Sequence, residues 1–186
     1  MPAKKQSRAK ATVKSSQRTT RATEAAPHDA TVGLPHMPAM YIGQKRDKFL
    51  PWRHAEERLI RSRSDWICTT RPDGRPHSAP VWGFWDDGAL YFGTHRETRK
   101  ARNIERNPSV SIHLESGDDV VILEGRAEEV DPKALTKRFD AASRKKYRMP
   151  MMIPPGGVMF RVKPRVVLAW TEKEFPTNST RWEFRV

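Results

Sequence analysis

The chain has 186 residues, a formal net charge of +13 at pH 7 and a single cysteine, Cys68. This length predicts one compact domain with room for a tail, and the lone cysteine excludes a disulfide framework or a cysteine-based zinc site. Because long apolar runs and a secretory signal are absent, we expect a cytoplasmic protein without a membrane span, and the charge predicts an anionic partner.

Basic residues are dense at the N-terminus. Residues 1–36 contain seven lysines and arginines against two acidic residues, and few large apolar side chains. Such a segment cannot bury enough apolar surface to order itself. We therefore expect a disordered basic tail over residues 1–40 and a single folded domain over residues 41–186. The tail is interpreted either as a solubilising extension or as a non-specific contact for nucleic acid or an anionic surface.

Periodicity and turn residues predict the elements of the first half. Residues 51–60 predict a helix, because a proline stands in the first turn and apolar residues share one side. Residues 65–70, 77–85 and 89–94 predict three strands, joined by turns that contain Pro-Asp-Gly and Asp-Asp-Gly. These three strands are expected to form a meander.

A polar helix with an unusual concentration of bases follows the third strand. Arg96, Arg99 and Lys100 lie in its first turns, where the helix dipole favours acidic side chains and disfavours bases. A phosphate would reverse this cost, because the N–H groups of a helix start and basic side chains both bind it. The alternative is a solvated basic face with internal ion pairs through Glu97.

Two threonines are candidate caps of this helix. Thr94-His95-Arg96-Glu97 has the form of a capping box, with a hydroxyl at the cap and Glu97 reaching back to the backbone. Thr98 is the alternative cap, one turn later. Either threonine would add its hydroxyl to the group of bases.

The second half of the chain continues the β pattern. Alternation predicts a strand at residues 110–115 and a longer strand at residues 120–130, in which Gly125 marks a bulge. Further strands are expected near the C-terminus, at residues 158–162, 166–170 and 181–186.

A helix is expected between these strands. Asp131-Pro132 predicts its start, with an acidic cap and a proline in the first turn. Leu135, Phe139 and Ala142 are expected on its buried side. A loop rich in proline, methionine and glycine follows at residues 149–157.

About six strands with short hairpins, and two or three helices, predict a mainly β (α+β) fold. We expect an antiparallel barrel with flanking helices rather than a doubly wound fold. The sequence contains neither GxGxxG nor GxxxxGK[ST], so the Rossmann and P-loop routes to a nucleotide are unsupported.

Several stretches resemble a known superfamily: "TTRPDGRPHSAPVWGFWDDGALYFGT", "TRKARNIERNPSVSIHLE", "PRVVLAW" and "STRWEF". They are similar to the split β-barrel flavin-binding superfamily, which includes the pyridoxamine phosphate oxidases and the flavin/deazaflavin-dependent oxidoreductases. The similarity runs from about Ala55 to Val186, and TRKARN is its most specific part. The resemblance implies a six-stranded split β-barrel that forms a homodimer, with two cofactor sites at the subunit interface.

The resemblance also implies a cofactor, either FMN or the deazaflavin coenzyme F420. A flavin needs a phosphate clamp and an apolar wall, and the sequence visibly offers both. The positions that match the family's cofactor residues are Thr98, Arg99 and Lys100 at the phosphate, Thr94 and His95 at the phosphate or ribityl chain, Thr69, Arg71, Pro80, Val81 and Trp82 beside the ring, and Trp170 and Arg181 from the other subunit.

Two departures bear on the substrate. Pyridoxamine phosphate oxidases carry an arginine and a lysine where this chain has Ser78 and Gly83, and their C-terminal Arg-x-His element is missing from residues 179–184. These differences argue against a vitamin B6 substrate. The stretches "DGRPHSAPVWGFW" and "GDDVVILEG" are more similar to the branch that uses F420 or FMN on diverse acceptors.

We therefore predict a flavin/deazaflavin-dependent oxidoreductase that transfers hydride to or from a small unsaturated or aromatic substrate. No catalytic residue and no metal site are assigned, although His77, His95 and His113 are candidate proton donors by type. The alternatives are a non-catalytic flavin- or haem-binding protein on the same barrel and a pyridoxamine phosphate oxidase proper. A nucleic-acid-binding module driven by the tail is a third class, for which no helix-turn-helix or RNA-binding signature is present.

Overall fold

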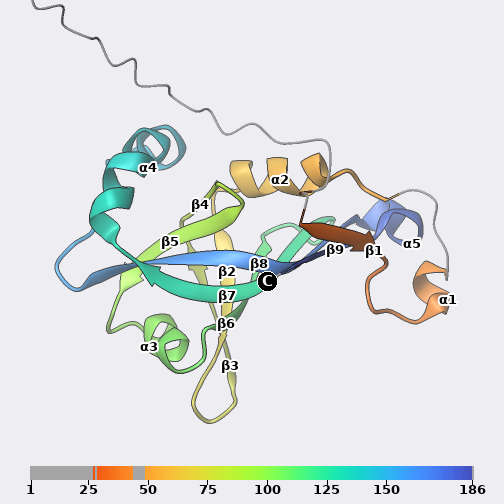
Figure 1. The fold of residues 1–186 in the computed structure, drawn as a ribbon, viewed down its shortest axis with the longest axis horizontal. Helices are drawn as coiled ribbons and strands as arrows, with labels where there is room; N and C mark the ends of the chain where they lie inside the picture. Colours follow the sequence, from red (N-terminus) through yellow and green to blue (C-terminus); the bar gives the residue numbers. More distant parts are fainter. Residues whose placement is uncertain (1–26, 28, 44–48, 186) are drawn as a thin grey trace, which may run out of the picture.

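The computed structural model describes residues 27, 29–43 and 49–185 (Figure 1). The strands are β1 (Ala30–Gly33), β2 (Asp65–Thr70), β3 (Pro76–Val81), β4 (Gly83–Asp86), β5 (Ala89–His95), β6 (Ser109–Leu114), β7 (Asp119–Val130), β8 (Gly157–Thr171) and β9 (Thr180–Phe184). The helices are α1 (Ala39–Ile42), α2 (Trp52–Arg61), α3 (Arg99–Arg106), α4 (Pro132–Tyr147), the 3₁₀ turn η1 (Glu172–Glu174) and α5 (Phe175–Asn178).

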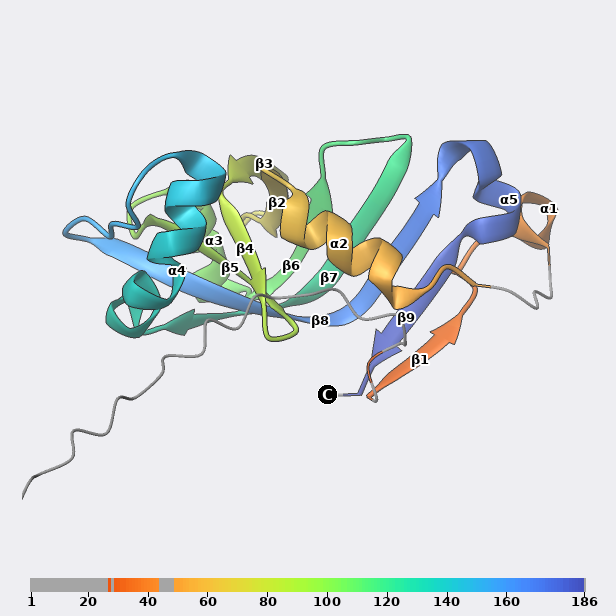
Figure 2. The same cartoon turned by 90° about the horizontal axis from the view of Figure 1, so that it is seen from above.

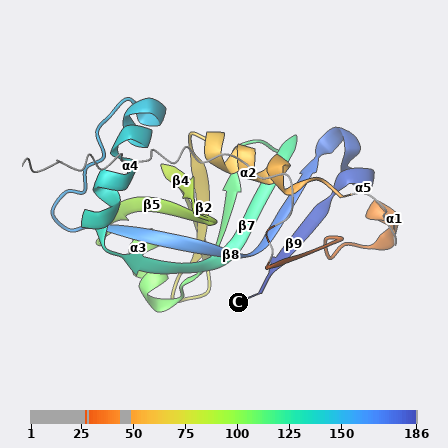
Figure 3. The same cartoon turned by 45° about the horizontal axis from the view of Figure 1, so that its top comes forward.

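The strands form one antiparallel sheet around β8. The main order is β1-β9-β8-β7-β6-β2-β3, while β5 pairs with β4 and with the first half of β8. Strand β7 follows β8 along nearly its whole length, and β9 takes the other edge of its second half. In Figure 1 this central pair separates α2 and α4 on one side from α3 on the other, and Figure 3 agrees. The mainly β fold with flanking helices is therefore confirmed, as a curved sheet that does not close completely.

The described residues form nine strands and not about six, and the strands differ from the predicted ranges in three places. Residues 77–85 form two strands because the chain leaves the ladder at Trp82. The predicted strands at residues 158–162 and 166–170 are one continuous strand that runs through Pro164. Strand β1 was not expected at all.

Gly125 marks a bulge, as the sequence predicts. The register passes from Glu124 opposite Val166 to Gly125 opposite Pro164, so β8 carries one extra residue, Arg165. A bulge at this point accommodates Pro164 inside the sheet, because proline has no backbone N–H to donate to the neighbouring strand. The irregularity lets β8 bend between its two partner strands.

The barrel interior is filled by large apolar side chains. The ring of Trp52 on α2 contacts Trp182 and Phe184 with centroids 5.4 and 5.6 Å apart, and it meets Trp85 at 6.1 Å. Glu56 is buried beside them and accepts a hydrogen bond of 3.3 Å from the Trp85 indole N–H. These contacts fix α2 across the open end of the sheet, as aromatic pairs contribute more than area alone.

Helix α4 covers a second cluster. Its buried residues are spaced by four, at Leu135, Phe139, Ser143 and Tyr147. Phe139 stacks on Phe84 of β4 at 4.9 Å. The expectation that Ala142 is buried is wrong, because a period of four selects position 143 and leaves Ala142 exposed.

The N-terminal boundary also differs from the prediction. Strand β1 pairs with β9 from Ala30 opposite Phe184 to Gly33 opposite Arg181, and α1 follows it, so residues 30–33 and 39–42 do not belong to a disordered tail. Residues 1–26 lie outside the described residues, and the expectation for them stays a prediction. Among the helices that the structure describes, none is long and apolar enough to cross a membrane.

We predict that Gly125→Ala destabilises the protein by about 1–3 kcal/mol, the usual range for overpacking. An added Cβ would lie 2.3 Å from the backbone oxygen of Lys163, which cannot move aside without breaking the ladder. Urea unfolding measures the effect. Gly117→Ala is the control, because nothing lies within 4 Å of its added Cβ, and equal stability of the two variants would contradict the prediction.

Candidate functional site

The basic helix begins one turn later than the capping box predicts. Thr98 is the N-cap of α3, and its hydroxyl accepts a hydrogen bond of 3.4 Å from the N–H of Ala101. The Thr98 hydroxyl also donates to the carbonyl of His95 at 2.8 Å and lies 3.1 Å from the Thr94 hydroxyl. Thr94 therefore supports the cap and is not the cap itself. The structure brings both threonines to the helix start.

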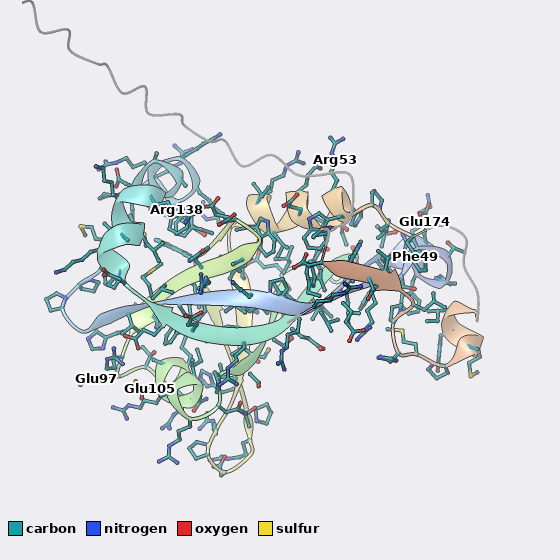
Figure 4. All side chains as sticks on the ribbon, viewed as in Figure 1. Phe49, Arg53, Glu97, Glu105, Arg138 and Glu174 are labelled. Atoms are coloured by element: carbon teal, nitrogen blue, oxygen red, sulfur yellow. The ribbon has the colours of Figure 1, made fainter. Side chains whose placement is uncertain are left out.

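Arg96 precedes α3 and is already neutralised. Its guanidinium donates to Glu129 of β7 at 2.5 Å and to Glu105 of α3 at 3.0 Å. Figure 4 shows Glu97 and Glu105 on the α3 side of the sheet, away from Arg138 on α4. The structural alternative of internal ion pairs thus holds for Arg96, through acidic residues other than Glu97.

Arg99 and Lys100 differ from Arg96, because the structure gives neither side chain an ion pair within its described ranges. Arg99 is exposed, and Lys100 is half-buried. Burial lowers the pKa of the Lys100 ammonium, and no neighbouring acid opposes this effect. By helix geometry, the N–H groups of these two residues also have no acceptor inside α3.

His77 of β3 lies beside the same cations. Burial lowers the pKa of its imidazole most, and the charges of Arg71, Lys100 and Arg99 lower it further. Its Nδ1 lies 3.4 Å from the Thr69 hydroxyl. These effects favour the neutral imidazole of His77 over its charged form, and a neutral imidazole can donate or accept a hydrogen bond among positive groups.

Asn103 is a residue of this site that sequence reasoning missed. It is fully buried in α3 and donates through Nδ2 to the Thr69 hydroxyl at 3.0 Å. Its Oδ1 accepts no hydrogen bond in the part of the chain that the structure describes. Asparagine is a poor helix former, so its place inside the predicted helix was the available signal.

The group at the start of α3 is a cluster of donors. It combines Arg71, Arg99 and Lys100 with two threonine hydroxyls and the free N–H groups of a helix N-terminus. Such a donor set fits a phosphate, which accepts hydrogen bonds on every oxygen and compensates the charge. We call this group, Arg71, Thr94, Thr98, Arg99 and Lys100, the clamp.

His95 lies between the clamp and the loop that precedes β8. Its Nδ1 accepts a hydrogen bond of 3.3 Å from the N–H of Glu97. An added Cβ on Gly156 would be 2.4 Å from its Nε2, so the ring packs directly against that glycine, which has a φ of +77°. The clamp is therefore bounded on this side by residues 153–157.

The predicted ring-flanking segment lies at the far end of β3. Val81 is buried, Pro80 is exposed, and Trp82 is 46% exposed in the break between β3 and β4. The Trp82 ring stacks on Tyr147 of α4, with centroids 4.5 Å apart and an interplanar angle of 7°. From His77 to Trp82 the strand covers roughly 16 Å at 3.3 Å per residue.

Trp170 and Arg181 do not reach the clamp within one chain. They lie on β8 and β9, and β7 and β6 separate these strands from β2. Trp170 packs edge-on against Phe175, and Arg181 pairs with Glu183 at 2.5 Å. In Figure 2, β9 and α5 lie at the end of the molecule opposite α4.

One row of residues nevertheless connects the predicted positions across the sheet. Register pairs place on the same face Pro80, Trp66, His113, Ile122, Leu168 and Arg181. All six are exposed or half-buried, and Trp66 stacks on His113 with an interplanar angle of 4°. We call this row the outer row. A groove of about 630 Å³ runs beside it, lined by Cys68, Thr69, Ser111, Glu124 and Val166 among others.

The two positions of the first substrate-related departure, Ser78 and Gly83, have different surroundings. Ser78 lies on β3 with its hydroxyl 3.2 Å from the Cys68 sulfur. At Gly83, an added Cβ would be 2.1 Å from a carboxylate oxygen of buried Asp65, so no lysine fits this position. Among the described residues, no group of three or more His, Cys, Asp or Glu side chains is arranged to hold a metal ion.

The fold is that of a split β-barrel protein, and the clamp is a group of donors whose chemistry suits a phosphate. Residues 52–171 match the family described as pyridoxamine 5'-phosphate oxidase, and the chain belongs to this family.

Solved structures agree with this assignment. General Stress Protein 26 from Bacillus anthracis is 28% identical, with 62% of this chain and 90% of that chain covered and a TM-score of 0.51. A protein named F420 Reductase is 27% identical, with 60% and 94% covered and a TM-score of 0.51. An FMN binding protein related to pyridoxamine 5'-phosphate oxidase, from Nostoc punctiforme, is 18% identical, with 72% and 87% covered and a TM-score of 0.52, and it shows the fold alone.

We predict that the imidazole of His77 titrates below the ordinary value of 6.5 in the unliganded protein. Neighbouring cations disfavour its protonated form, so Arg99→Gln with Lys100→Gln raises its pKa but does not restore it fully, because burial remains. An NMR titration of the ring protons measures both values. Arg144→Gln with Lys145→Gln on α4 is the matched control, and a pKa at or above 6.5 in the parent protein would overturn the assignment.

Proposed function

We propose that the chain is a flavin- or deazaflavin-dependent oxidoreductase that binds FMN or coenzyme F420 by its phosphate at the clamp. The observation that carries the proposal is the start of α3, where Thr98 caps the helix beside Thr94 and where Arg99 and Lys100 have no ion pair among the described residues. Both cofactors carry a phosphate group, so the clamp suits either. The solved structure named F420 Reductase, which is 27% identical, supports the deazaflavin candidate.

The residues of this chain bind and orient the cofactor. Arg99 and Lys100 hold the phosphate together with the free N–H groups of the helix start, which the hydroxyl groups of Thr94 and Thr98 keep in place. The bound cofactor supplies the hydride chemistry, transferring hydride to or from a small unsaturated or aromatic substrate. Pro80, which is exposed near the end of β3, forms the wall beside which the ring lies.

His77 acts at the phosphate end. Its distance from Trp82, roughly 16 Å along β3, removes it from the reacting end of an elongated cofactor. Burial and the neighbouring cations also lower the pKa of its imidazole, which disfavours the protonated form that a proton donor needs. We therefore assign His77 to phosphate recognition and not to proton donation to the acceptor.

The active form is proposed to be a homodimer formed through the outer row. The row presents apolar and aromatic side chains that a single chain leaves partly exposed, and such surfaces are typical of interfaces. In a two-fold arrangement, Arg181 at one end of the row approaches the other end on the second copy. This would bring Trp170 and Arg181 to the partner's segment around Pro80, which is proposed to lie beside the ring.

We predict that Arg99→Ala with Lys100→Ala weakens the binding of FMN and of F420 at least about 100-fold. Two charge-assisted hydrogen bonds contribute about 1.5–3 kcal/mol each, and 1.4 kcal/mol is a factor of ten. Isothermal titration calorimetry measures the affinity and thermal unfolding measures the fold. Arg144→Ala with Lys145→Ala is the control with the same residue types. Unchanged affinity with a lowered melting temperature would reject the clamp.

We also predict that inactive variants complement each other. Lys100→Ala and Arg181→Ala each lose cofactor binding as homodimers, but mixing and refolding them produces heterodimers in which one site is intact. About a quarter of all sites then bind cofactor, if the subunits combine at random. Cofactor absorbance after gel filtration measures this fraction. No recovery in a confirmed heterodimer would show that Arg181 does not act across the interface.

A further inference from the structure

Trp82 has one covered face and one open face. Its ring stacks in parallel on Tyr147, which is 4% exposed, while Trp82 itself is 46% exposed. A large aromatic side chain with a stacked partner below and solvent above is arranged to receive a second flat ring. Aromatic rings prefer offset stacked or edge-on contacts of this kind.

The surrounding structure holds this ring in place. The carbonyl of Gly83, the next residue, accepts hydrogen bonds from the Tyr147 hydroxyl at 2.9 Å and from the Lys146 ammonium at 2.8 Å. The Asp65 carboxylate packs against the same glycine. Val81, on the other side of Trp82, is buried. The ring is therefore preorganised, and little conformational freedom is lost when a ligand binds.

The charges near the stacked pair are engaged elsewhere. The Lys146 ammonium donates to the Gly83 carbonyl and lies 5.5 Å from the Tyr147 ring centroid and 5.9 Å from that of Phe84. Burial lowers its pKa, while the charge of Asp65 opposes that shift. The stacked pair of Trp82 and Tyr147 therefore offers a flat apolar surface and no free cation. A ligand is selected there by its shape and by whether it contains a flat ring.

Trp82 lies close to the place where the proposed reaction occurs. Trp82 ends the segment that carries the wall of the cofactor ring, at the opposite end of β3 from the clamp. A molecule that lies beside the reactive ring meets the open face of Trp82. An aliphatic acceptor would gain little from this surface, whereas a flat aromatic acceptor would stack on it.

We propose that Trp82, backed by Tyr147, is an acceptor platform that selects planar acceptors with a fused aromatic ring, such as naphthoquinones, over non-aromatic enones. This inference rests on the proposed function, because it names the substrate class of the same site. Trp82 then determines specificity, and Tyr147 positions it.

The test compares two probes on three variants. The planar probe is 2,3-dimethyl-1,4-naphthoquinone, whose blocked ring carbons prevent addition to Cys68, and the non-aromatic probe is isophorone. Their dissociation constants are measured by ligand-observed NMR on the cofactor-free protein and on the protein loaded with oxidised FMN or F420. The variants are Trp82→Leu, the conservative Trp82→Tyr, and Tyr41→Leu as the control at an exposed aromatic residue of α1.

The platform predicts a selective loss. Trp82→Leu weakens binding of the naphthoquinone at least about tenfold with and without cofactor, changes isophorone binding less than twofold, and leaves cofactor affinity within twofold. Trp82→Tyr restores most of the loss, and Tyr41→Leu changes nothing. An equal fall in cofactor affinity would place Trp82 in the cofactor site, and a changed oligomeric state would place it in the interface, so either result overturns the platform.

The same measurements separate the two proposals. If the parent protein binds neither FMN nor F420 but still binds the naphthoquinone through Trp82, the proposed function fails and the platform stands as an aromatic binding site. If the cofactor binds and the affinity for the naphthoquinone does not change when Trp82 is replaced, only the platform proposal is rejected.

Discussion

The site depends on the long strand β8. Its first half pairs with β5 and its second half with β9, while β7 supports both halves from the other edge. Strand β5 leads directly into the start of α3, so its pairing with β8 decides where that helix begins. The Thr69–Asn103 hydrogen bond then ties the helix to β2. A bulge at Gly125 lets one continuous strand serve both neighbours, and the positions of all other parts follow from it.

The basic side chains of the clamp differ in their pairing from other basic side chains in the described structure. Arg58, Arg96 and Arg161 each pair with a carboxylate within 2.6 Å. Arg99 and Lys100 occupy a place where a helix dipole already adds positive charge, and the structure supplies them with no acid within its described residues. Basic side chains at a helix N-terminus raise the free energy of the unliganded protein. A bound dianion would remove that cost, which is why the proposed phosphate fits this arrangement.

Local patterns predicted much of this fold. The helix at 51–60, the strand at 65–70, the bulge at Gly125 and the Asp131 cap follow from turn chemistry and periodicity, and the structure has all of them. The break at Trp82 could not be predicted, because it results from the packing of Gly83 against Asp65 and α4. Neither could the pairing of Arg96 with Glu129, which lies 33 positions away. Asn103 could in principle have been identified from the sequence, because asparagine is a poor helix former, but its hydrogen-bond partner Thr69 could not. More of the fold than of the site could therefore be predicted from the sequence, because the site depends on contacts between distant segments.

The short strand β1 has a practical meaning for anyone who trims the chain. Judged by charge, a cut after residue 36 would look harmless, yet it removes the residues that pair with β9 from Val32 opposite Trp182 to Ala30 opposite Phe184. The backbone N–H and C=O groups on that side of β9 would then face water. An uncovered edge of this kind recruits strands from neighbouring molecules. A truncated version made to improve crystals would thus exchange a charged extension for a tendency to form fibrils.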